Sequence, residues 1–308
     1  MKFKLTLVLF LLAAFSISAQ KKQVCFTIDD LPVVSYGDND QFYLWNITLN
    51  LISKFDKYNI PAIGFVNEGK LFREGVMDSS QLDLLKLWFQ NGYEIGNHTF
   101  SHLSYHKSTF EEFKKDLIKG ESISRHLEQE YNKELRYFRH PYLQIGNNQS
   151  KYDKLNALLD SMEYTVAPVT IGNKDWMFAS AYAKADRDRD RDLMAAIGDE
   201  YVSYTRESIK FSESQSQKLF TRNIRHVMLI HANKLNADYL DEIADVFIEE
   251  GYEFITLNEI LKDPAYQSEI TVFKENGTSW LDSWAQSRNL VEGFYEGAPV
   301  VPEWIENP

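Results

Sequence analysis

The sequence predicts an α/β protein built on a deformed or incomplete (β/α) barrel of seven to eight parallel strands, with a helical insertion and an irregular C-terminal tail. Short runs rich in β-branched and aromatic residues alternate with helical patterns along most of the chain. This order is typical of parallel strands joined by crossover helices. The length of 308 residues, 44% of them hydrophobic, also suits one large domain, because α/β barrels of about 250 residues stay whole.

The strand candidates are short apolar runs bounded by turn residues. They cover residues 24–28, 62–66, 93–96, 136–139, 164–169, 227–230 and 252–255. Helical patterns lie between them at residues 41–58, 81–90, 109–129, 151–162 and 237–250. Ser108 and Glu111 have the spacing of a capping box for the third helix, and Gly92 and Gly251 follow helical runs as stop signals.

The alternation stops over residues 177–225, which contain no strand candidate. We expect a helical insertion there, with helices at 179–198 and 200–220. Residues 186–192 alternate Asp with Arg, so their charges nearly cancel, and we interpret them as a solvated helical face.

The two ends of the chain differ in composition from the rest. Lys2 and Lys4 precede an apolar run too short to span a bilayer comfortably, and small residues follow it, which is the order of a secretory signal peptide. We expect a signal peptide at 1–19, one domain over 20–262 and a tail over 263–308, in a secreted or periplasmic protein. An uncleaved N-terminal anchor is the alternative.

The charge balance limits the class of partner. The chain has 33 Lys+Arg against 45 Asp+Glu, a formal net charge of −12. This composition offers no basic surface for nucleic acid or an anionic membrane. A neutral or cationic partner is expected, and glucosamine-type polymers, which gain positive charge as they are deacetylated, would fit.

Side chains that suit a divalent metal ion occur in two distant segments. Asp29 and Asp30 end the first strand candidate, and His98 and His102 follow the third. Adjacent carboxylates raise each other's pKa unless a cation or another partner lies beside them. Histidines at i and i+4 would stand on one face of a helical turn, near enough to bind one ion. Two histidines and one aspartate would leave positions open for water and substrate, as catalytic zinc sites do.

Further polar clusters follow later strand candidates. Arg139-His140-Pro141-Tyr142 ends the fourth, Asp175-Trp176 follows the fifth after a short loop, and His231 ends the sixth. Barrel enzymes place their sites on the loops at the C-terminal ends of the strands. We therefore expect these clusters to lie close together at the C-terminal end of the barrel.

These segments together resemble the five motifs of the polysaccharide deacetylase family (NodB homology, carbohydrate esterase family 4) over roughly residues 22–262. Thr27-Ile28-Asp29-Asp30 is similar to the first motif, which implies that Asp29 is the catalytic base and Asp30 a metal ligand. His98 and His102 match the two metal-binding histidines of the second.

The remaining motifs carry further implied roles. Arg139-x-Pro141-Tyr142 resembles the third motif, in which Arg139 would hold a catalytic carboxylate and the backbone N–H of Tyr142 would help to form an oxyanion hole. Asp175-Trp176 resembles the end of the fourth, with Trp176 as a substrate-binding aromatic. His231 resembles the histidine of the fifth, the general acid.

Two departures from the motifs distinguish this chain. Leu31-Pro32 stands where most members have Gly, which resembles a less typical secreted branch with Asp-Asp-Leu-Pro in the first motif. Gly172 occupies the position of the first Asp in the fourth motif, which leaves Asp175 as the only carboxylate there. The sequence leaves open whether Asp175 holds His231 or Arg139.

The resemblance implies a metal-dependent hydrolase that removes N-acetyl groups from an acetylated glycan. Zn²⁺ is the expected ion, with Co²⁺, Ni²⁺ and Mn²⁺ as alternatives, and it would polarise the acetyl oxygen and activate water. Two other functions stay open. The same scaffold could hydrolyse another C–N amide or an O-acetyl ester, or the protein could be a non-catalytic glycan-binding protein of the cell envelope.

Overall fold

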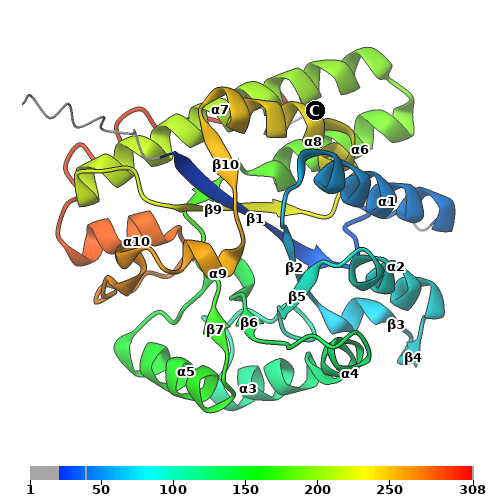
Figure 1. The fold of residues 1–308 in the computed structure, drawn as a ribbon, viewed down its shortest axis with the longest axis horizontal. Helices are drawn as coiled ribbons and strands as arrows, with labels where there is room; N and C mark the ends of the chain where they lie inside the picture. The colour runs from blue at the N-terminus through cyan, green and yellow to red at the C-terminus, as the bar shows by residue number, and fades with distance from the viewer. Residues whose placement is uncertain (1–20, 39, 307–308) are drawn as a thin grey trace, which may run out of the picture.

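One parallel sheet runs through the middle of the protein (Figure 1). The computed structural model describes residues 21–38 and 40–306, so the expected signal peptide lies outside the described residues. Within them, the sheet has eight strands in the order β7-β6-β5-β2-β1-β9-β8, with β10 paired to β1 beside this path. The predicted fold class is therefore confirmed. The strands are β1 (Lys22–Leu31), β2 (Ile63–Val66), β5 (Glu94–Asn97), β6 (Tyr137–Phe138), β7 (Thr165–Val166), β8 (Ile171–Gly172), β9 (His226–His231) and β10 (Tyr252–Phe254).

The sheet curls toward a barrel without closing through hydrogen bonds. The strands β7 and β8 are the two ends of the sheet order, yet only residues 167–170 separate them in the chain. Five residue steps span at most about 18 Å, so the two edges must approach each other. A separate hairpin pairs β3 (Phe72–Arg73) with β4 (Val76–Met77).

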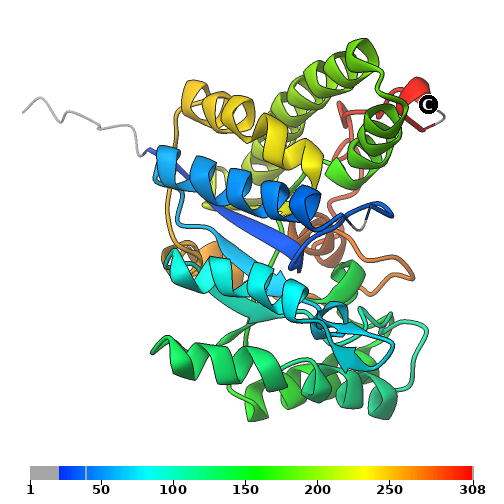
Figure 2. The same cartoon turned by 90° about the vertical axis from the view of Figure 1, so that its right-hand side faces the viewer.

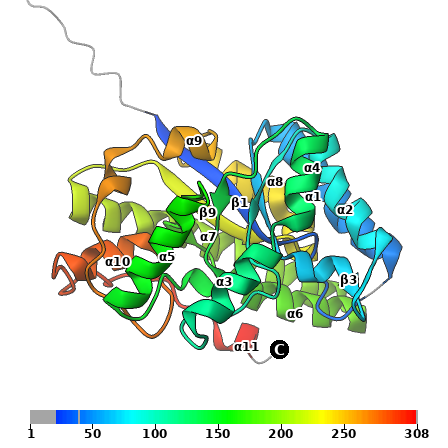
Figure 3. The ribbon, with the colours of Figure 1, turned by 90° about the horizontal axis from the view of Figure 1, so that it is seen from below.

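Helices surround the curled sheet, as Figure 2 and Figure 3 show from two further sides. They are α1 (Gln41–Tyr58), α2 (Ser79–Gln90), α3 (Phe110–Lys119), α4 (Ser122–Glu130), α5 (Gln149–Ser161), α6 (Asp175–Asp188), α7 (Arg191–Phe220), α8 (Lys234–Glu249), α9 (Leu257–Ile260), α10 (Trp280–Ser287) and α11 (Glu303–Glu306). The part of the chain that the structure describes also contains the 3₁₀ turns η1 (Glu68–Leu71), η2 (Pro141–Leu143) and η3 (Pro264–Gln267). None of the helices in the described chain is both long and apolar enough to cross a bilayer.

Local sequence accounts for the central strand and the first helix. Residues 24–28 of β1 are fully buried, as expected for a strand covered on both faces. Asp40 caps α1 by accepting a hydrogen bond from the backbone N–H of Tyr43, and the helix ends at Asn59 in the left-handed conformation. Leu44, Ile47, Leu51 and Phe55 bury one stripe of this helix, which packs it onto the sheet.

The predicted helix at 109–129 is in fact two helices. The break lies at Gly120, where a Cβ atom would come within 2.4 Å of the backbone of Thr99 and Phe100. The backbone of Thr99 and Phe100 therefore determines where the helix breaks, and no local sequence pattern indicates this contact. The capping box is also one residue later than predicted and joins Thr109 to Glu112.

The insertion also differs from the prediction. Its helices are α6 and the 30-residue α7, and they meet at Arg189, which has φ of 58°. The interpretation of residues 186–192 as one helical face is wrong, because Asp190 caps α7 by accepting a hydrogen bond from Leu193 N–H. The side chains of residues 187–192 are nevertheless exposed.

The tail is more ordered than predicted, because residues 280–287 form the helix α10. Trp280 and Trp284 face inward and belong to an apolar cluster with Leu219 of α7 and Ile270. The backbone N–H of Trp280 donates to Val169 O at 2.8 Å, in the short segment between β7 and β8. The tail thus packs beside the seam of the barrel, which is the place where the end strands β7 and β8 approach each other without pairing.

Truncating Trp284 should release the tail from this cluster. Trp284 is 1% exposed and packs against Phe220 and Tyr266. Trp284→Ala should lower the free energy of unfolding by about 3–5 kcal/mol, measured by urea denaturation. Val300→Ala is the control, because Val300 is 81% exposed and such changes stay within about 0.5 kcal/mol. Equal losses in both variants would contradict a tail that packs as part of the core.

Candidate active site

The strand register brings the predicted site residues to one edge of the sheet. Asp29 pairs with His231 across β1 and β9. On the other side of β1, Val66 pairs with Leu31 and with Asn97, so His98 begins the loop next to the end of β1. Parallel strands all end at the same edge, which explains why Asp29 and His231 converge here although they lie far apart in the chain.

The structure brings Asp30, His98 and His102 together. The ligand atoms of these side chains lie within 4.8 Å of one another, and Asp30 Oδ1 is 3.6 Å from Nε2 of each histidine. The histidines do not stand on a helical turn, so that prediction is wrong. They lie in an irregular loop after β5, in which Thr99 and His102 have φ of 67° and 55°. The carbonyl of His98, which a helix would bond to residue 102, instead accepts from Asn67 Nδ2 at 2.5 Å.

These three side chains fit a divalent ion because each turns one possible ligand atom toward the other two. His98 Nδ1 lies 2.8 Å from the backbone oxygen of Arg139 and must donate to it. Burial lowers the pKa of His98 to about 4, so the ring is neutral and Nε2 presents a lone pair. Asp30 Oδ1 is buried and has no hydrogen-bond partner among the described residues. Ligand atoms around a tetrahedral zinc lie roughly 3.4 Å apart, close to the observed 3.6 Å.

Lys70 is a neighbour of this group that no motif in the sequence indicated. Its Nζ atom donates to the backbone oxygen of Asp30 at 2.7 Å and lies 3.9 Å from Asp30 Oδ2. Burial opposes ionisation of Asp30, but nearby positive charges, first of all that of Lys70 and also that of His231, outweigh it, so the pKa of Asp30 falls below its ordinary value. Asp30 is therefore ionised, as a metal ligand must be.

Asp29 and Arg139 form a buried pair beside these ligands. Asp29 Oδ2 lies 3.8 Å from Arg139 Nη1 and 3.7 Å from His98 Nε2. Arg139 is fully buried and donates from Nη2 to Thr27 Oγ1 at 2.8 Å, which fixes the guanidinium. Burial raises the pKa of Asp29 to about 6 against the opposing charge of Arg139. Asp29 is thus largely ionised at pH 7, yet basic enough to accept a proton.

Asp175 pairs with His231, which answers the question that the sequence left open. Asp175 Oδ1 lies 2.8 Å from His231 Nδ1, and Oδ2 accepts from the His231 backbone N–H at 2.8 Å. Asn233 and Asn236, which the sequence analysis did not identify, also donate to Oδ2 at 3.1 and 2.7 Å. Burial favours a neutral imidazole, but the charge of Asp175 outweighs it and raises the pKa of His231 to about 9. His231 therefore carries a proton at neutral pH.

Tyr142 and Trp176 border the site with exposed rings. Each is 56% exposed. The Tyr142 ring centroid lies 4.3 Å from that of His102, so Tyr142 stands next to the group of Asp30, His98 and His102. Trp176 follows Asp175 in the first turn of α6, and its backbone oxygen accepts from Tyr36 at 3.0 Å.

The tail contacts the loop that carries Tyr142. A Cβ atom at Gly277 would lie 1.8 Å from Tyr142 O and 2.7 Å from the carbonyl carbon of Leu143. Glu275 O accepts from His106 Nδ1 at 2.7 Å, which attaches the same tail segment to the loop beyond His102. Only glycine permits this close approach, so residue 277 supports the position of Tyr142.

Sequence comparison relates the chain to known deacetylases. The family model described as polysaccharide deacetylase matches residues 16–165. A peptidoglycan-N-acetylglucosamine deacetylase from Bacillus cereus is 26% identical over 168 residues, which are 54% of this chain and 51% of that protein. The chain thus spans about half the length of this curated relative.

Solved structures show the same fold at lower identity. The Bc1960 peptidoglycan N-acetylglucosamine deacetylase aligns with 78% of this chain and 88% of its own, at a TM-score of 0.52 and 18% identity. The chitin deacetylase of the fungus Colletotrichum lindemuthianum aligns with 84% and 94%, at 0.52 and 16%. A pseudoenzyme of the CE4 family from Bacillus anthracis aligns with 79% and 66%, also at 0.52 and 16%. Proteins named as deacetylases and a pseudoenzyme share this fold, so the fold alone does not assign an activity.

Loss of either histidine should weaken zinc binding. His98→Ala and His102→Ala each remove one of the three facing ligand atoms, so the Kd for Zn²⁺ should rise by more than about 100-fold, beyond the 10–100-fold cost of losing a supporting partner. Isothermal titration of chelator-treated protein measures this change. His126→Ala, an exposed histidine on α4, is the control. Unchanged Kd values for Zn²⁺ in His98→Ala and His102→Ala would contradict a metal site at these residues.

A methyl group at Gly277 should displace the Tyr142 loop. Gly277→Ala should lower the free energy of unfolding by about 1–3 kcal/mol, the usual cost of overpacking, and speed hydrogen exchange of the amides at 142–146. Gly172→Ala is the control, because a Cβ there meets no atom within 4 Å. If the amides at 142–146 exchange at the wild-type rate in Gly277→Ala, the tail does not support the loop.

Proposed function

Because the chain belongs to the polysaccharide deacetylase family, we propose that it is a metal-dependent hydrolase that removes N-acetyl groups from an acetylated glycan. One observation carries the proposal. Asp29, a carboxylate with a pKa near 6, and His231, an imidazole with a pKa near 9, are cross-strand neighbours beside the three facing ligand atoms. Amide hydrolysis needs a base for the attacking water and an acid for the departing amine, and this pair supplies both.

The ligands and the base act on the water and the acetyl group. Asp30, His98 and His102 would hold the ion, for which we propose Zn²⁺ and which when bound supplies a Lewis acid for the acetyl oxygen and the water. Asp29 accepts the proton of the attacking water as oxygen adds to the acetyl carbon. Arg139 holds Asp29 in place and favours its ionised form.

The acid completes the reaction. The Nδ1 atom of His231 is bonded to Asp175, so the proton for the leaving nitrogen comes from Nε2. That proton passes to the amine as the C–N bond breaks, and acetate and a free amino group result. The backbone N–H of Tyr142 would stabilise the developing oxyanion, a contribution of about 10²–10³ in rate for a single donor.

We also propose that the protein acts outside the cytoplasm. The order of basic, apolar and small residues at 2–19 supports export. Mass spectrometry of protein produced in an exporting bacterial host should find a mature N-terminus near Gln20. A chain that keeps Met1 would argue for an uncleaved anchor instead.

Acetate release tests the proposed activity. Wild-type protein should release acetate from at least one of chitin oligomers, peptidoglycan fragments and acetylated xylan, and the first two report N-deacetylation while the third reports O-deacetylation. Asp29→Asn should lower the rate by about 10²–10⁴-fold, and chelation should abolish it. Asp188→Asn, an exposed aspartate, is the control.

The outcomes separate the alternatives. Release that survives both chelation and Asp29→Asn would exclude the metal-and-base chemistry. A folded, metal-loaded protein that binds glycans but releases nothing from any of them would favour a non-catalytic binding protein.

The alkaline limit of the activity should depend on Asp175. His231 must be protonated to act as the acid, so activity should fall as the pH rises through about 9, the raised pKa of His231. Asp175→Asn removes the negative charge that raises this pKa, so the alkaline limb should move to lower pH, toward the ordinary value of about 6.5. Rate profiles from pH 5 to 10 measure the shift. An unmoved alkaline limb would assign it to another group.

A further inference from the structure

The strand β1 carries one extra residue at the point where it delivers Asp30. Along β1 and β2, Ile28 pairs with Gly64 and Leu31 pairs with Val66. Three residue steps on β1 therefore lie against two on β2, which is a β-bulge. A bulge leaves its extra residue out of the ladder and redirects the side chains around it.

The bulge turns two neighbouring carboxylates toward one imidazole. Successive residues of a regular strand point to opposite faces, yet Asp29 Oδ2 and Asp30 Oδ1 lie 3.7 and 3.6 Å from His98 Nε2. Asp30 has φ of 67°, in the left-handed region that residues with a side chain seldom adopt unless surrounding contacts maintain it. The orientation of the Asp30 carboxylate therefore depends on the contacts that stabilise this backbone.

Lys70 supplies such contacts. Its Nζ atom donates to the backbone oxygens of Asp30 at 2.7 Å and Val33 at 3.3 Å, and it lies 3.9 Å from Asp30 Oδ2. Asp30 is in register with no residue of β2 or β9, so Lys70 attaches it from outside the ladder. A lysine ammonium has three N–H donors, and these three oxygens give each of them an acceptor in the segment of Asp30.

The residue before η1 connects the same turn to the histidine loop. The backbone N–H of Asn67 donates to Leu31 O at 3.2 Å, and Asn67 Nδ2 donates to His98 O at 2.5 Å. Asn67 is 2% exposed. The end of β1 and the start of the loop after β5 are thus both bonded to one short turn, in which Asn67 and Lys70 are the donors.

We propose that Lys70 is a positioning residue for the metal ion, because it holds the bulge at Asp30 so that the carboxylate faces His98 and His102. This inference rests on the metal site of the proposed function. Two other roles for Lys70 make different predictions. If Lys70 acted only as a positive charge, it would repel a divalent ion, and its removal would tighten metal binding. If it acted only in folding, its removal would change stability without changing metal affinity.

Zinc affinity separates these roles. Lys70→Met keeps the length of the side chain and removes its donors, so the Kd for Zn²⁺ should rise by about 10–100-fold, the usual cost of losing a partner of a metal ligand. Lys70→Arg keeps donors for the two carbonyls and should restore most of the affinity. Lys107→Met replaces an exposed lysine of the loop after His102 and is the matched control, with an unchanged Kd. Isothermal titration of chelator-treated protein measures these values.

Two further measurements report the position of Asp30 itself. In the metal-free protein, the backbone amides at 30, 31 and 33 should exchange hydrogen faster in Lys70→Met than in wild type, because the segment has lost its attachment. The visible absorption of the Co²⁺-loaded protein depends on the coordination geometry, so it should change in Lys70→Met and return toward wild type in Lys70→Arg. Lys70→Gln, which is shorter and uncharged, replaces Lys70→Met if that variant does not fold, and its Kd should also rise.

The Kd values can contradict the proposal in two ways. A Kd for Zn²⁺ in Lys70→Met that equals or falls below the wild-type value would overturn it, and a lower value would assign Lys70 the role of a plain charge. An equal rise in Lys70→Met and Lys70→Arg would show that the hydrogen bonds to the two carbonyls do not position Asp30.

The positioning role and the proposed function fail in different ways. Wild-type protein that binds Zn²⁺ more tightly than Lys70→Met but releases no acetate from any glycan would keep the positioning role and reject the deacetylase. Acetate release that chelation abolishes, with one Kd for wild type and Lys70→Met, would keep the deacetylase and reject the positioning role. Wild-type protein that binds no Zn²⁺ would overturn both.

Discussion

The candidate site depends on one carboxylate oxygen and two imidazole nitrogens that face one another. Asp30 Oδ1 and His98 Nε2 are both acceptors 3.6 Å apart, because the 2.8 Å contact from His98 Nδ1 to Arg139 O prevents that ring from turning its N–H toward the carboxylate. A divalent cation between them would remove the repulsion of these two atoms. The ends of β1, β5 and β6 each supply one part of the arrangement, so the sheet must hold these strands in register for the site to exist.

Around these atoms the protein separates a base from an acid by environment alone. Asp29 and Asp175 are both buried aspartates, yet their pKa values move in opposite directions. Arg139 lies 3.8 Å from Asp29 Oδ2, and Asp29 Oδ1 has no hydrogen-bond partner among the described residues, so burial outweighs the charge of the arginine. Asp175 accepts four hydrogen bonds, including one from the imidazole of His231, and stays ionised. One carboxylate can therefore take a proton while the other keeps a proton on its partner.

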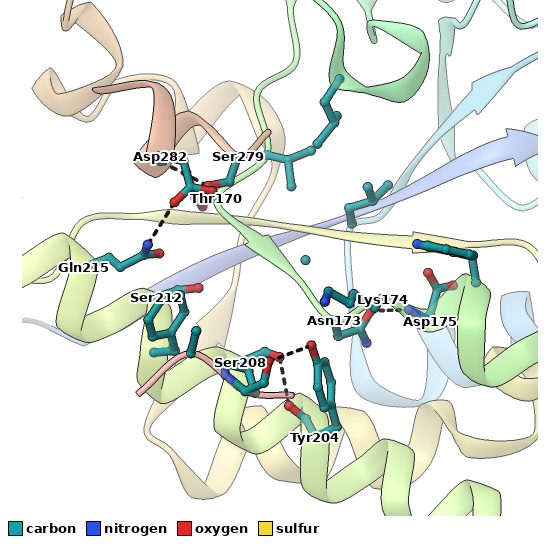
Figure 4. Close-up of a pocket in the computed structure, with 18 of the residues that line it drawn as sticks. Thr170, Asn173, Lys174, Asp175, Tyr204, Ser208, Ser212, Gln215, Ser279 and Asp282 are labelled. Carbon is teal, nitrogen blue, oxygen red and sulfur yellow. Dashed lines mark hydrogen bonds between the residues drawn. The ribbon is translucent and has the colours of Figure 1, made fainter. Parts of the chain in front are cut away.

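The tail connects the seam of the barrel to the candidate active site. The tail packs beside the seam between β7 and β8 and approaches the Tyr142 backbone at Gly277. Asp282 of the tail also accepts a hydrogen bond from Gln215 of α7. Residues of the tail also line the cavity that Asp175 and His231 border (Figure 4). The same segment therefore covers the seam and lies beside the candidate active site.

Local features of the sequence determined the alternation of strands and helices, the bounds of α1 at residues 41–58, and the polar residues that follow each strand, because apolar runs, caps and strand ends are set by near neighbours. Tertiary structure alone decided the rest. The loop that holds His98 and His102, the break at Gly120, the short strand β8 and the choice of His231 as the partner of Asp175 all depend on groups that lie far away in the chain or belong to another element. Such contacts form only when the sheet has brought those segments together, so no local pattern in the sequence records them.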